Sequence, residues 1–403
     1  MMLLNGVALV TGGLPQWVRR IGFPPSTIPP KVFPVAFERL TRFTMDSPYR
    51  KELEVAFGVL RQASKISQHL VNAKDKGAVS KNDQSPVTIA DFAIQALLAA
   101  SFKRAFPNDV LVGEEDAGKL RQDQALLETV WELLQWLAKD ESAAKQCTLP
   151  ASRGDMCDLI DQCGTSQPSS SQRTWIFDPI DGTKAFVSGH LYAINIGLLV
   201  DGQQAVGAVG CPNLSIDARA PLRNEDVDSK GEGCIVYAVK GHGSFVRPLT
   251  DADTPHRRLS VTPITDTKDL RFVSCLGHVY SALPGIHDTI AQRLDAPPPT
   301  CDLIAWVLRW VALAMGLGNA TVWVYKDRQR FGKVWDHAGA MLLFEEAGGN
   351  IRCTLEKRID LASGRLMDQN FGFVAAPAGD VFNKLLDTTR TVMKETGHEA
   401  WLS

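Results

Sequence analysis

The chain has 403 residues, of which 45% are hydrophobic and 22% are charged. This composition is typical of a globular protein with a substantial apolar core. With 43 Lys and Arg against 45 Asp and Glu, the formal net charge is -2. A nearly neutral chain lacks the excess of cations that binding to nucleic acid or to a membrane surface requires, and no apolar run approaches the roughly 20 residues of a membrane-spanning helix. We therefore expect neither nucleic acid nor a membrane among its partners.

The eight cysteines are scattered and form no recognisable motif. No CxxC pair occurs, and no group of cysteine and histidine has the spacing of a zinc site. Free, buried thiols in a reducing compartment are the preferred interpretation, and disulfides are the alternative. The cysteines therefore favour a cytoplasmic protein.

Residues 1–45 differ in texture from the rest of the chain. Asn5-Gly-Val-Ala-Leu-Val-Thr-Gly-Gly13 resembles the first strand and glycine turn of short-chain dehydrogenases, but Leu14-Pro-Gln-Trp17 follows where a phosphate-binding turn needs further glycines. Basic residues predominate, as in a targeting peptide, yet the prolines from Pro24 to Pro34 oppose the amphipathic helix of such a peptide. We expect a disordered extension, or a start site placed upstream of the true one at Met45.

Residues 46–255 predict an α+β domain with an antiparallel sheet. Apolar residues recur at helical spacing in three segments, 49–73, 89–104 and 124–138. Short apolar runs predict strands at 110–112, 175–177, 234–239 and 244–246, and a polar, serine-rich loop spans 163–172. Two further strands, 193–200 and 203–209, flank Asp201-Gly202, the dipeptide favoured in two-residue hairpin turns.

Residues 256–403 predict an α/β domain, because strands and helices alternate there. The strands are expected at 271–275, 321–325 and 371–375. The helices are expected at 302–316, 337–347 and 379–394. The fold class is therefore α+β in the first part and α/β in the second.

The most informative segment is Asp178-Pro-Ile-Asp-Gly-Thr183, which directly follows the predicted strand 175–177. Pro179 restricts the backbone, so that Asp178 and Asp181 can converge across a tight turn that also exposes the Ile180 carbonyl. Carboxylates and a carbonyl are the oxygen ligands that Mg²⁺ prefers, and Mg²⁺ completes its shell with waters and substrate phosphate. The alternative is an aspartate-rich turn that caps a helix.

Further carboxylates stand at the ends of other predicted elements. Glu114 and Glu115 follow a strand, Asp336 precedes a helix, and Asp91 lies three residues after Thr88. Taken singly, Asp336 is explained equally well as a helix N-cap, and Thr88 with Asp91 as a capping box. If they share one pocket they need cations, since two unit charges about 4 Å apart repel by about 4 kcal/mol at an effective dielectric near 20.

Together these segments resemble the lithium-sensitive, magnesium-dependent phosphatases of the inositol monophosphatase superfamily, and within it the 3'(2'),5'-bisphosphate nucleotidases. The resemblance covers about residues 46–403 and implies a layered αβαβα sandwich. The four ordered motifs that carry it are 81–91, 112–115, 175–184 and 334–338, and the segment Gly210-Cys-Pro-Asn-Leu214 is typical of the nucleotidase branch.

The resemblance implies an enzyme that hydrolyses the 3'-phosphate of adenosine 3',5'-bisphosphate, or of a similar small bisphosphate, with water activated by two or three Mg²⁺ ions. It also implies which residues bind the metal: Glu114, Asp178, Asp181, Asp336 and the carbonyl of Ile180, with Asp91 as a further ligand. Asp91 and Thr183 would pair to position the attacking water. The residues expected on the substrate side are Gly182, Thr183, His278 and Arg309.

The chain departs from the family pattern mainly on the nucleotide side. The departures near the metal ligands, Ala185 and the inverted pair Gly339-Ala340, are small. The family carries a Ser and a Lys in the helix near the base and an Arg in the next strand, where this chain has Trp306-Val-Leu-Arg309 and Trp323. Arg309 preserves one cation, and the two tryptophans either stack on a base or belong to the core.

Two alternative functions follow from these departures. The first is the same chemistry on inositol phosphates, with the tryptophans closing the adenine space. The second is a catalytically weak paralogue that binds a metabolite and regulates. The basic group of residues 326, 328, 330 and 333 either binds a second phosphate or forms a solvated loop, and His287 and His337 are expected to be structural.

Overall fold

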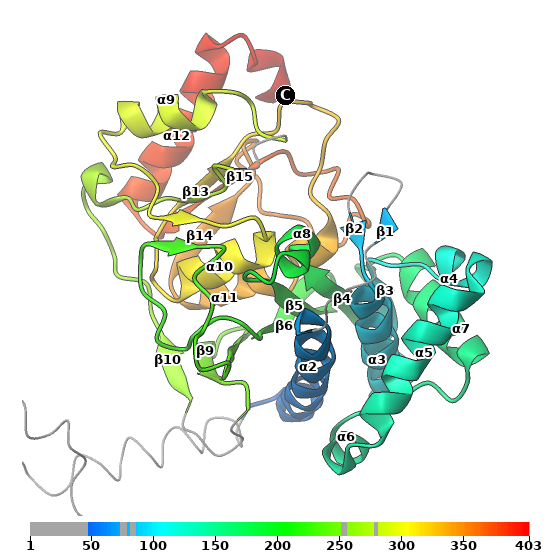
Figure 1. The fold of residues 1–403 in the computed structure, drawn as a ribbon. Coiled ribbons are helices and arrows are strands. Elements are labelled where there is room, and N and C mark those ends of the chain that lie inside the picture. The colour runs from blue at the N-terminus through cyan, green and yellow to red at the C-terminus, as the bar shows by residue number, and fades with distance from the viewer. Residues whose placement is uncertain (1–46, 73–78, 81–85, 251–255, 278–280, 403) are drawn as a thin grey trace, which may run out of the picture.

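The computed structural model describes residues 47–72, 79–80, 86–250, 256–277 and 281–402 (Figure 1). The predictions made for residues 1–45 and for His278 lie outside these ranges. Among the described residues, no helix combines the length and the apolar character needed to cross a membrane.

A seven-stranded sheet forms the centre of the fold, in the order β10-β9-β8-β6-β5-β4-β3. Its strands are β3 (Val110–Gly113), β4 (Thr174–Asp181), β5 (Ala193–Val200), β6 (Gln203–Cys211), β8 (Cys234–Val239), β9 (Gly243–Pro248) and β10 (Arg257–Leu259). Only β3 and β4 run parallel; the other neighbours are antiparallel. The predicted β5–β6 hairpin is confirmed, and Asp201 and Gly202 take the positive φ angles, 49° and 74°, that its two-residue turn requires.

The sheet separates two apolar cores, because successive side chains of a strand point to opposite faces. Trp175 and Phe177 of β4 pack into one core, together with the helices α2 (Arg50–Val71) and α3 (Ile89–Ala105). Ile176 packs into the other core, with residues from the second half of the chain. The continuous apolar run that ends in Asp178 therefore reflects burial of β4 on both faces.

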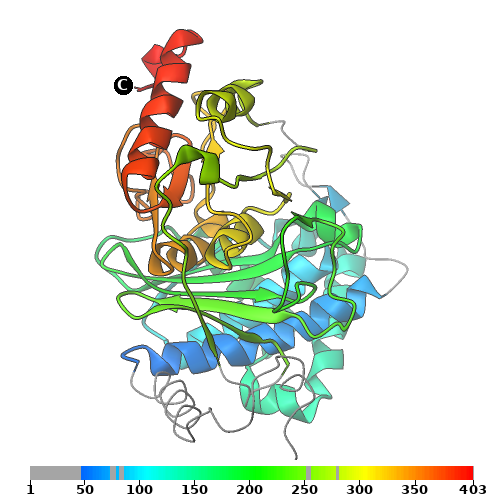
Figure 2. The same ribbon diagram turned by 90° about the vertical axis from the view of Figure 1, so that its left-hand side faces the viewer.

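Three further layers lie on the Ile176 side of the sheet (Figures 1 and 2). The helices α10 (Trp306–Ala314) and α11 (Ala340–Glu346) pack directly on it. Above them lies a three-stranded antiparallel sheet of β13 (Thr321–Trp323), β15 (Phe373–Pro377) and β14 (Gly349–Arg352), covered by α9 (Ile286–Arg293) and α12 (Asp380–Glu395). The expected five-layered α+β sandwich is confirmed, and the domain boundary near residue 255 stays a prediction.

The remaining elements are short or peripheral. The helices are α4 (Gly118–Gln122), α5 (Gln124–Ala138), α6 (Glu141–Gln146), α7 (Arg153–Thr165) and α8 (Thr183–Val187), with 3-10 turns η2 (Thr267–Asp269), η3 (Val334–Asp336) and η4 (Glu399–Leu402). The short strands are β1 (Val79–Ser80), β2 (Pro86–Val87), β7 (Leu222–Arg223), β11 (Val273–Ser274) and β12 (Cys301–Asp302).

Helix α7 was not predicted, and it takes up the first residues of the expected loop 163–172. Its sequence is rich in polar residues and glycine, which weakens the helical pattern. Tertiary packing compensates, because one face of the helix is buried from Met156 to Cys163. The side chain of Ser152 caps the start of the helix by accepting a hydrogen bond from the Asp155 N–H.

All eight cysteines are free thiols, and all but Cys147 are buried. The expectation of free, buried thiols is therefore confirmed. Burial raises the pKa of Cys163 to about 12, so this thiol stays protonated and unreactive at neutral pH.

Candidate active site

Three carboxylates meet at the end of β4. The pairing of β4 with β5 shifts between Asp178 and Asp181, so the intervening Pro179 and Ile180 bulge out of the ladder. Asp336 is the last residue of the 3-10 turn η3. One carboxylate oxygen each from Asp178, Asp181 and Asp336 all lie within 4.8 Å of one another.

The pKa of Asp181 is strongly perturbed within this cluster. Burial, the nearby Asp336 carboxylate and, to a smaller extent, Glu114 raise its pKa well above the usual value. The N–H of Val307, in the first turn of α10, donates a hydrogen bond to its Oδ2 at 2.5 Å. Crowded carboxylates that offer only oxygen donors fit a hard divalent cation such as Mg²⁺, which removes the mutual repulsion.

Glu114 and Asp91 lie outside the group of three mutually close carboxylates. Glu114 is near enough to raise the pKa of Asp181, and its carboxylate lies 3.9 Å from Lys333 Nζ. Asp91 Oδ2 accepts hydrogen bonds from the N–H and the hydroxyl of Thr88, at 2.8 and 2.7 Å. The capping box is therefore present, and a metal-binding role for Asp91 stays a prediction.

The turn after the cluster holds the other predicted residues of this motif. Gly182 has a φ of 84°, a conformation that favours glycine, and a Cβ there would lie 2.9 Å from the Cβ of Ala305. The Thr183 hydroxyl donates to the Ile180 carbonyl at 3.2 Å. Helix α8, which Thr183 begins, contacts β2 just before Thr88. This contact brings the first and third motifs together, while the predicted Asp91–Thr183 pair stays a prediction.

Residues that the sequence analysis did not single out place Asp336 on the sheet. The Nδ2 of Asn195, which pairs with Asp178 across β4 and β5, donates to the Trp335 carbonyl at 2.6 Å. Gly207 of β6 lies under Gly339, because a Cβ on Gly207 would be only 2.1 Å from the Gly339 carbonyl oxygen. The sequence feature that could have identified Asn195 is that it is the only amide in an otherwise apolar strand.

Another lone amide, Gln95, holds the second motif. It lies one turn after Asp91 in α3 and is fully buried. Its Nε2 donates to the Glu115 carbonyl at 2.5 Å, and its Oε1 accepts from the Glu115 N–H at 2.8 Å. A Cβ on Gly113 would lie 2.7 Å from this Oε1, so glycine is required for the close approach. Gln95 therefore links the helix of the first motif to the strand end of the second.

Arg309 is buried between the two tryptophans rather than open to solvent. Its guanidinium carbon lies 4.1 Å from the ring centre of Trp306 and 4.6 Å from that of Trp323. The guanidinium donates to the carbonyls of Leu303, at 2.9 Å, and Ile304, at 3.0 Å. Trp323 is buried in the core, as one of the two interpretations held, whereas Trp306 is half-buried and packs against the core. A role of Arg309 in substrate binding stays a prediction.

The other predicted basic side chains of this region have different surroundings, and Lys333 Nζ lies 3.9 Å from the Glu114 carboxylate. Lys326 and Arg330 are exposed, and Arg328 lies over the Phe371 ring at 4.8 Å. This arrangement favours a solvated loop over a second phosphate site. His337 is buried and accepts a hydrogen bond at Nδ1 from Trp310 Nε1 at 3.0 Å, which agrees with a structural role.

A cleft of about 260 Å³ lies between β11 and α9, beside Trp323 and the other aromatic rings that pack around Arg309. The His287 side chain lines it and lies 5.2 Å, centre to centre, from the ring of Trp323.

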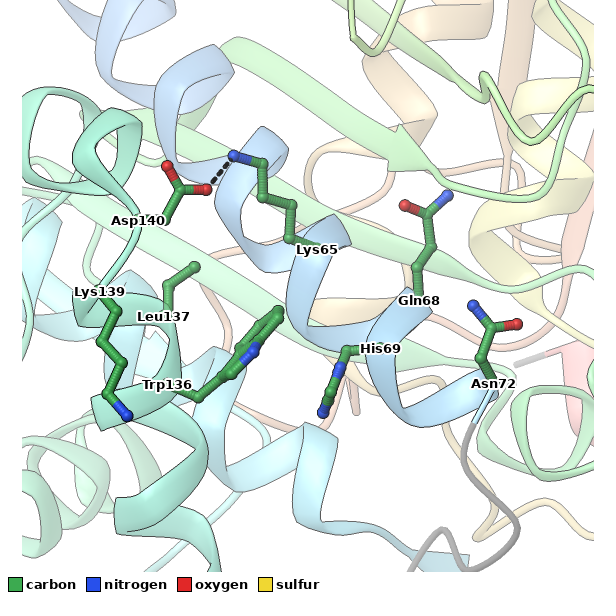
Figure 3. A pocket seen from close by; sticks show the side chains of 8 residues that line it. All are labelled: Lys65, Gln68, His69, Asn72, Trp136, Leu137, Lys139 and Asp140. Carbon is green, nitrogen blue, oxygen red and sulfur yellow. Dashed lines mark hydrogen bonds and ion pairs between the residues drawn. The ribbon is translucent and has the colours of Figure 1, made fainter.

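A larger, open hollow of about 540 Å³ lies between α2 and α5 (Figure 3). His69 stacks on Trp136 there, and Lys65 pairs with Asp140. None of the residues lining this second hollow is a predicted site residue.

His287 is expected to make the folded protein less stable in acid. Burial and the nearby Arg309 lower its pKa from 6.5 to about 4, and its Nε2 accepts a hydrogen bond from the Val324 N–H at 3.1 Å, which requires a neutral ring. The unfolded chain binds a proton at this histidine below pH 6.5, whereas the folded protein does so only below about pH 4. The contribution of neutral His287 to the free energy of unfolding is therefore fully present above pH 6.5 and is lost progressively as the pH falls to about 4. At pH 5 this loss amounts to about 2 kcal/mol.

Urea unfolding at pH 7 and pH 5 measures this effect. The half-buried His256 and the buried His337 also have lowered pKa values, about 4 and about 3, and add to the acid sensitivity of the wild type. The comparison that matters is therefore with His287→Gln, which should lose less stability between the two pH values. If His287→Gln loses as much unfolding free energy between pH 7 and pH 5 as the wild type, His287 does not cause the acid sensitivity.

Solved structures show that the fold is a known one. An IMPase from Thermotoga maritima matches with a TM-score of 0.53 at 16% identity, over 86% of this chain and 99% of that one. An inositol monophosphatase from Zymomonas mobilis matches with a TM-score of 0.53 at 17% identity, over 85% and 99%. At this identity the likeness shows the fold, a layered sandwich of the inositol monophosphatase type.

The sequence profile of the Inositol monophosphatase family matches residues 49–390, and the chain belongs to this family. A 3'(2'),5'-bisphosphate nucleotidase of Emericella nidulans is 36% identical, over 86% of this chain and 99% of that protein. A 3'(2'),5'-bisphosphate nucleotidase of Schizosaccharomyces pombe is 35% identical, over 86% and 97%. A 3',5'-bisphosphate nucleotidase of Arabidopsis thaliana is 31% identical, over 81% and 92%. The resemblance inferred from the four motifs is confirmed.

Proposed function

We propose that this protein is a Mg²⁺-dependent phosphomonoesterase that hydrolyses the 3'-phosphate of adenosine 3',5'-bisphosphate or of a similar small bisphosphate. The observation that carries the proposal is the close approach of Asp178, Asp181 and Asp336 at a strand end, in a chain of this family. The names of the relatives support a bisphosphate nucleotide as the substrate class.

The residues proposed to bind two or three Mg²⁺ ions are Asp178, Asp181, Asp336, Glu114 and the Ile180 carbonyl. When bound, Mg²⁺ polarises phosphate oxygens and favours ionisation of the attacking water. Val307 N–H supports this arrangement by fixing one oxygen of Asp181. The acidic set thus combines the charge and the rigidity that a catalytic metal site needs.

Asp91 and Thr183 are proposed to orient the attacking water and accept its proton. The contact between β2 and α8 supports this role, since it holds the start of α3 near Thr183. Gly182 and Thr183 are proposed to lie against the phosphate that is cleaved. Arg309 is proposed to act on the substrate side through its positive charge, which already acts on Asp181.

Hydrolysis of inositol phosphates is the second candidate. The observation that favours it is the packing of Trp306 and Trp323 against Arg309, because the guanidinium covers one face of each ring and leaves less aromatic surface for stacking on a base. A regulatory paralogue without turnover is opposed by the complete set of carboxylates. The cytoplasm is the proposed location, supported by the free thiols.

A substrate panel tests these proposals. Phosphate release from adenosine 3',5'-bisphosphate, an inositol phosphate and a sugar bisphosphate is measured with Mg²⁺, with chelator, and with Mg²⁺ plus Li⁺. We expect the highest kcat/KM on the nucleotide, no release with chelator, and inhibition by Li⁺. Faster release from the inositol phosphate would favour the second candidate, and no metal-dependent release from any compound would contradict the enzyme.

A further inference from the structure

Arg365 lies in the segment between β14 and β15 and reaches back to the second carboxylate motif. Its Nη2 donates hydrogen bonds to the carbonyl oxygens of Gly113, at 2.7 Å, and Glu114, at 3.3 Å. Its Nη1 donates to the carbonyls of Cys163, at 3.0 Å, and Ser166, at 3.3 Å. One guanidinium therefore joins the end of β3 to the end of α7.

The same residue also holds the fourth motif. The guanidinium carbon lies 4.6 Å from the ring centre of Trp335, within the range of a cation–π contact. The Arg365 carbonyl accepts a hydrogen bond from the Val334 N–H at 2.9 Å. Arg365 thus contacts the backbone of Glu114 on one side and the residue that precedes Asp336 on the other.

The chemistry of these contacts requires arginine. Four carbonyl acceptors and an aromatic face are satisfied at once only by a planar group with several N–H donors, whereas the ammonium of a lysine is a compact point charge. The hydrogen bonds go to backbone oxygens, so the side chain fixes the path of the main chain. Its charge also lies near Glu114, which helps to keep the guanidinium protonated against the cost of burial.

We infer that Arg365 is a positioning residue that sets the separation of Glu114 and Asp336 for binding of a divalent cation. The inference rests on the proposed function, because Glu114 and Asp336 are proposed there as ligands. It adds a residue far along the chain, outside the four motifs, that acts on the ligands through their backbone. Replacement of such supporting partners typically weakens metal affinity by about 10- to 100-fold.

Arg365→Met is the main variant, because it keeps an apolar stem over Trp335 and removes every donor. We expect its dissociation constant for Mg²⁺, measured by calorimetry without substrate, to rise at least about tenfold. In phosphate-release assays the Mg²⁺ concentration for half-maximal rate should rise similarly, while kcat at saturating Mg²⁺ falls less. Arg365→Lys should restore part of the affinity.

Arg390→Met is the matched control. Arg390 Nη1 donates to the Thr354 carbonyl at 2.7 Å, and its Nε pairs with Glu356 at 3.2 Å. The variant therefore also loses a hydrogen bond to a backbone carbonyl and a charged partner, but none of these groups is a proposed metal ligand. We expect a lower melting temperature and unchanged Mg²⁺ affinity.

Wild-type affinity in Arg365→Met, or an equal loss in Arg390→Met, would overturn the inference. If Arg365→Met does not fold, Arg365→Lys decides, and an unchanged dissociation constant overturns the inference there too. A wild type that binds Mg²⁺ but hydrolyses none of the panel compounds overturns the proposed function alone, since the calorimetric comparison still tests Arg365.

Discussion

Replacing Asp181 by Asn is expected to raise the melting temperature of the metal-free protein and to lower kcat/KM at saturating Mg²⁺ by about 10³-fold or more. The carboxylate is buried beside Asp336 and Glu114, and these effects raise its pKa. An amide of the same shape removes one of the repelling charges and can still accept the Val307 N–H bond. With Mg²⁺ present, the same change removes an anionic ligand.

Thermal unfolding with and without Mg²⁺, together with phosphate release, measures both effects. Asp123→Asn is the control, because Asp123 caps α5 by accepting the Leu126 N–H at 3.0 Å, and asparagine is an equally good cap. It should leave stability, the response to Mg²⁺ and turnover unchanged. An Asp181→Asn protein that keeps full turnover, or that is less stable than the wild type without metal, would contradict the electrostatic account.

The second large effect is expected from Gly207→Ala, a change of one methyl group in the middle of β6. The new Cβ would lie 2.1 Å from the Gly339 carbonyl oxygen, so the segment that follows Asp336 has to move away from the sheet. Overpacking of this kind costs about 1–3 kcal/mol of unfolding free energy. Because Asn195 holds Trp335 on the same strand pair, we also expect weaker Mg²⁺ binding and lower kcat.

Chemical unfolding and Mg²⁺ calorimetry on the variant test this prediction. Gly154→Ala in α7 is the matched control, since the nearest atom to its new Cβ, the Ser152 Oγ, is 3.7 Å away. Alanine within a helix should leave stability equal or slightly higher, by about 0.5–1 kcal/mol. Wild-type stability and metal affinity in Gly207→Ala would show that the close approach of β6 to Gly339 is not required.

The two variants separate two properties of the site. Asp181→Asn changes charge and preserves shape, so stability and activity should move in opposite directions. Gly207→Ala changes shape and preserves charge, so stability and activity should fall together. Opposite changes in stability and activity show that the charges of the cluster cost stability and serve metal binding. Parallel changes show that the position of the cluster depends on packing.

Much of the fold could be predicted from local patterns. The bounds predicted for α5 and β8 agree with the structure, because a helical period and a short apolar run are local properties. The helix expected at 302–316 is shorter, from Trp306 to Ala314, and the helix expected at 337–347 begins at Ala340 after a 3-10 turn. Element ends depend on caps and tertiary contacts, which periodicity does not show.

The site could be predicted only as a set of residue types. The strand that leads into Asp178-Pro-Ile-Asp181 indicated paired oxygen ligands, and the four motifs together indicated the family. Asn195 and Gln95 were not found, although each is a lone amide in an apolar element. Such an amide signals a buried hydrogen bond, but its partner lies elsewhere in the chain and cannot be read from the strand or helix that carries it.

The local elements, the carboxylate motifs and the family could be recognised without coordinates, because they depend on residue type and spacing. Three arrangements became visible in the folded protein: Asp336 meets Asp178 and Asp181, Trp306 and Trp323 enclose Arg309, and Arg365 holds the backbone of Glu114. These arrangements join residues far apart in the chain. They arise when the bulge in β4, the glycine contact at Gly207 and the packing of α10 fix those residues in three dimensions.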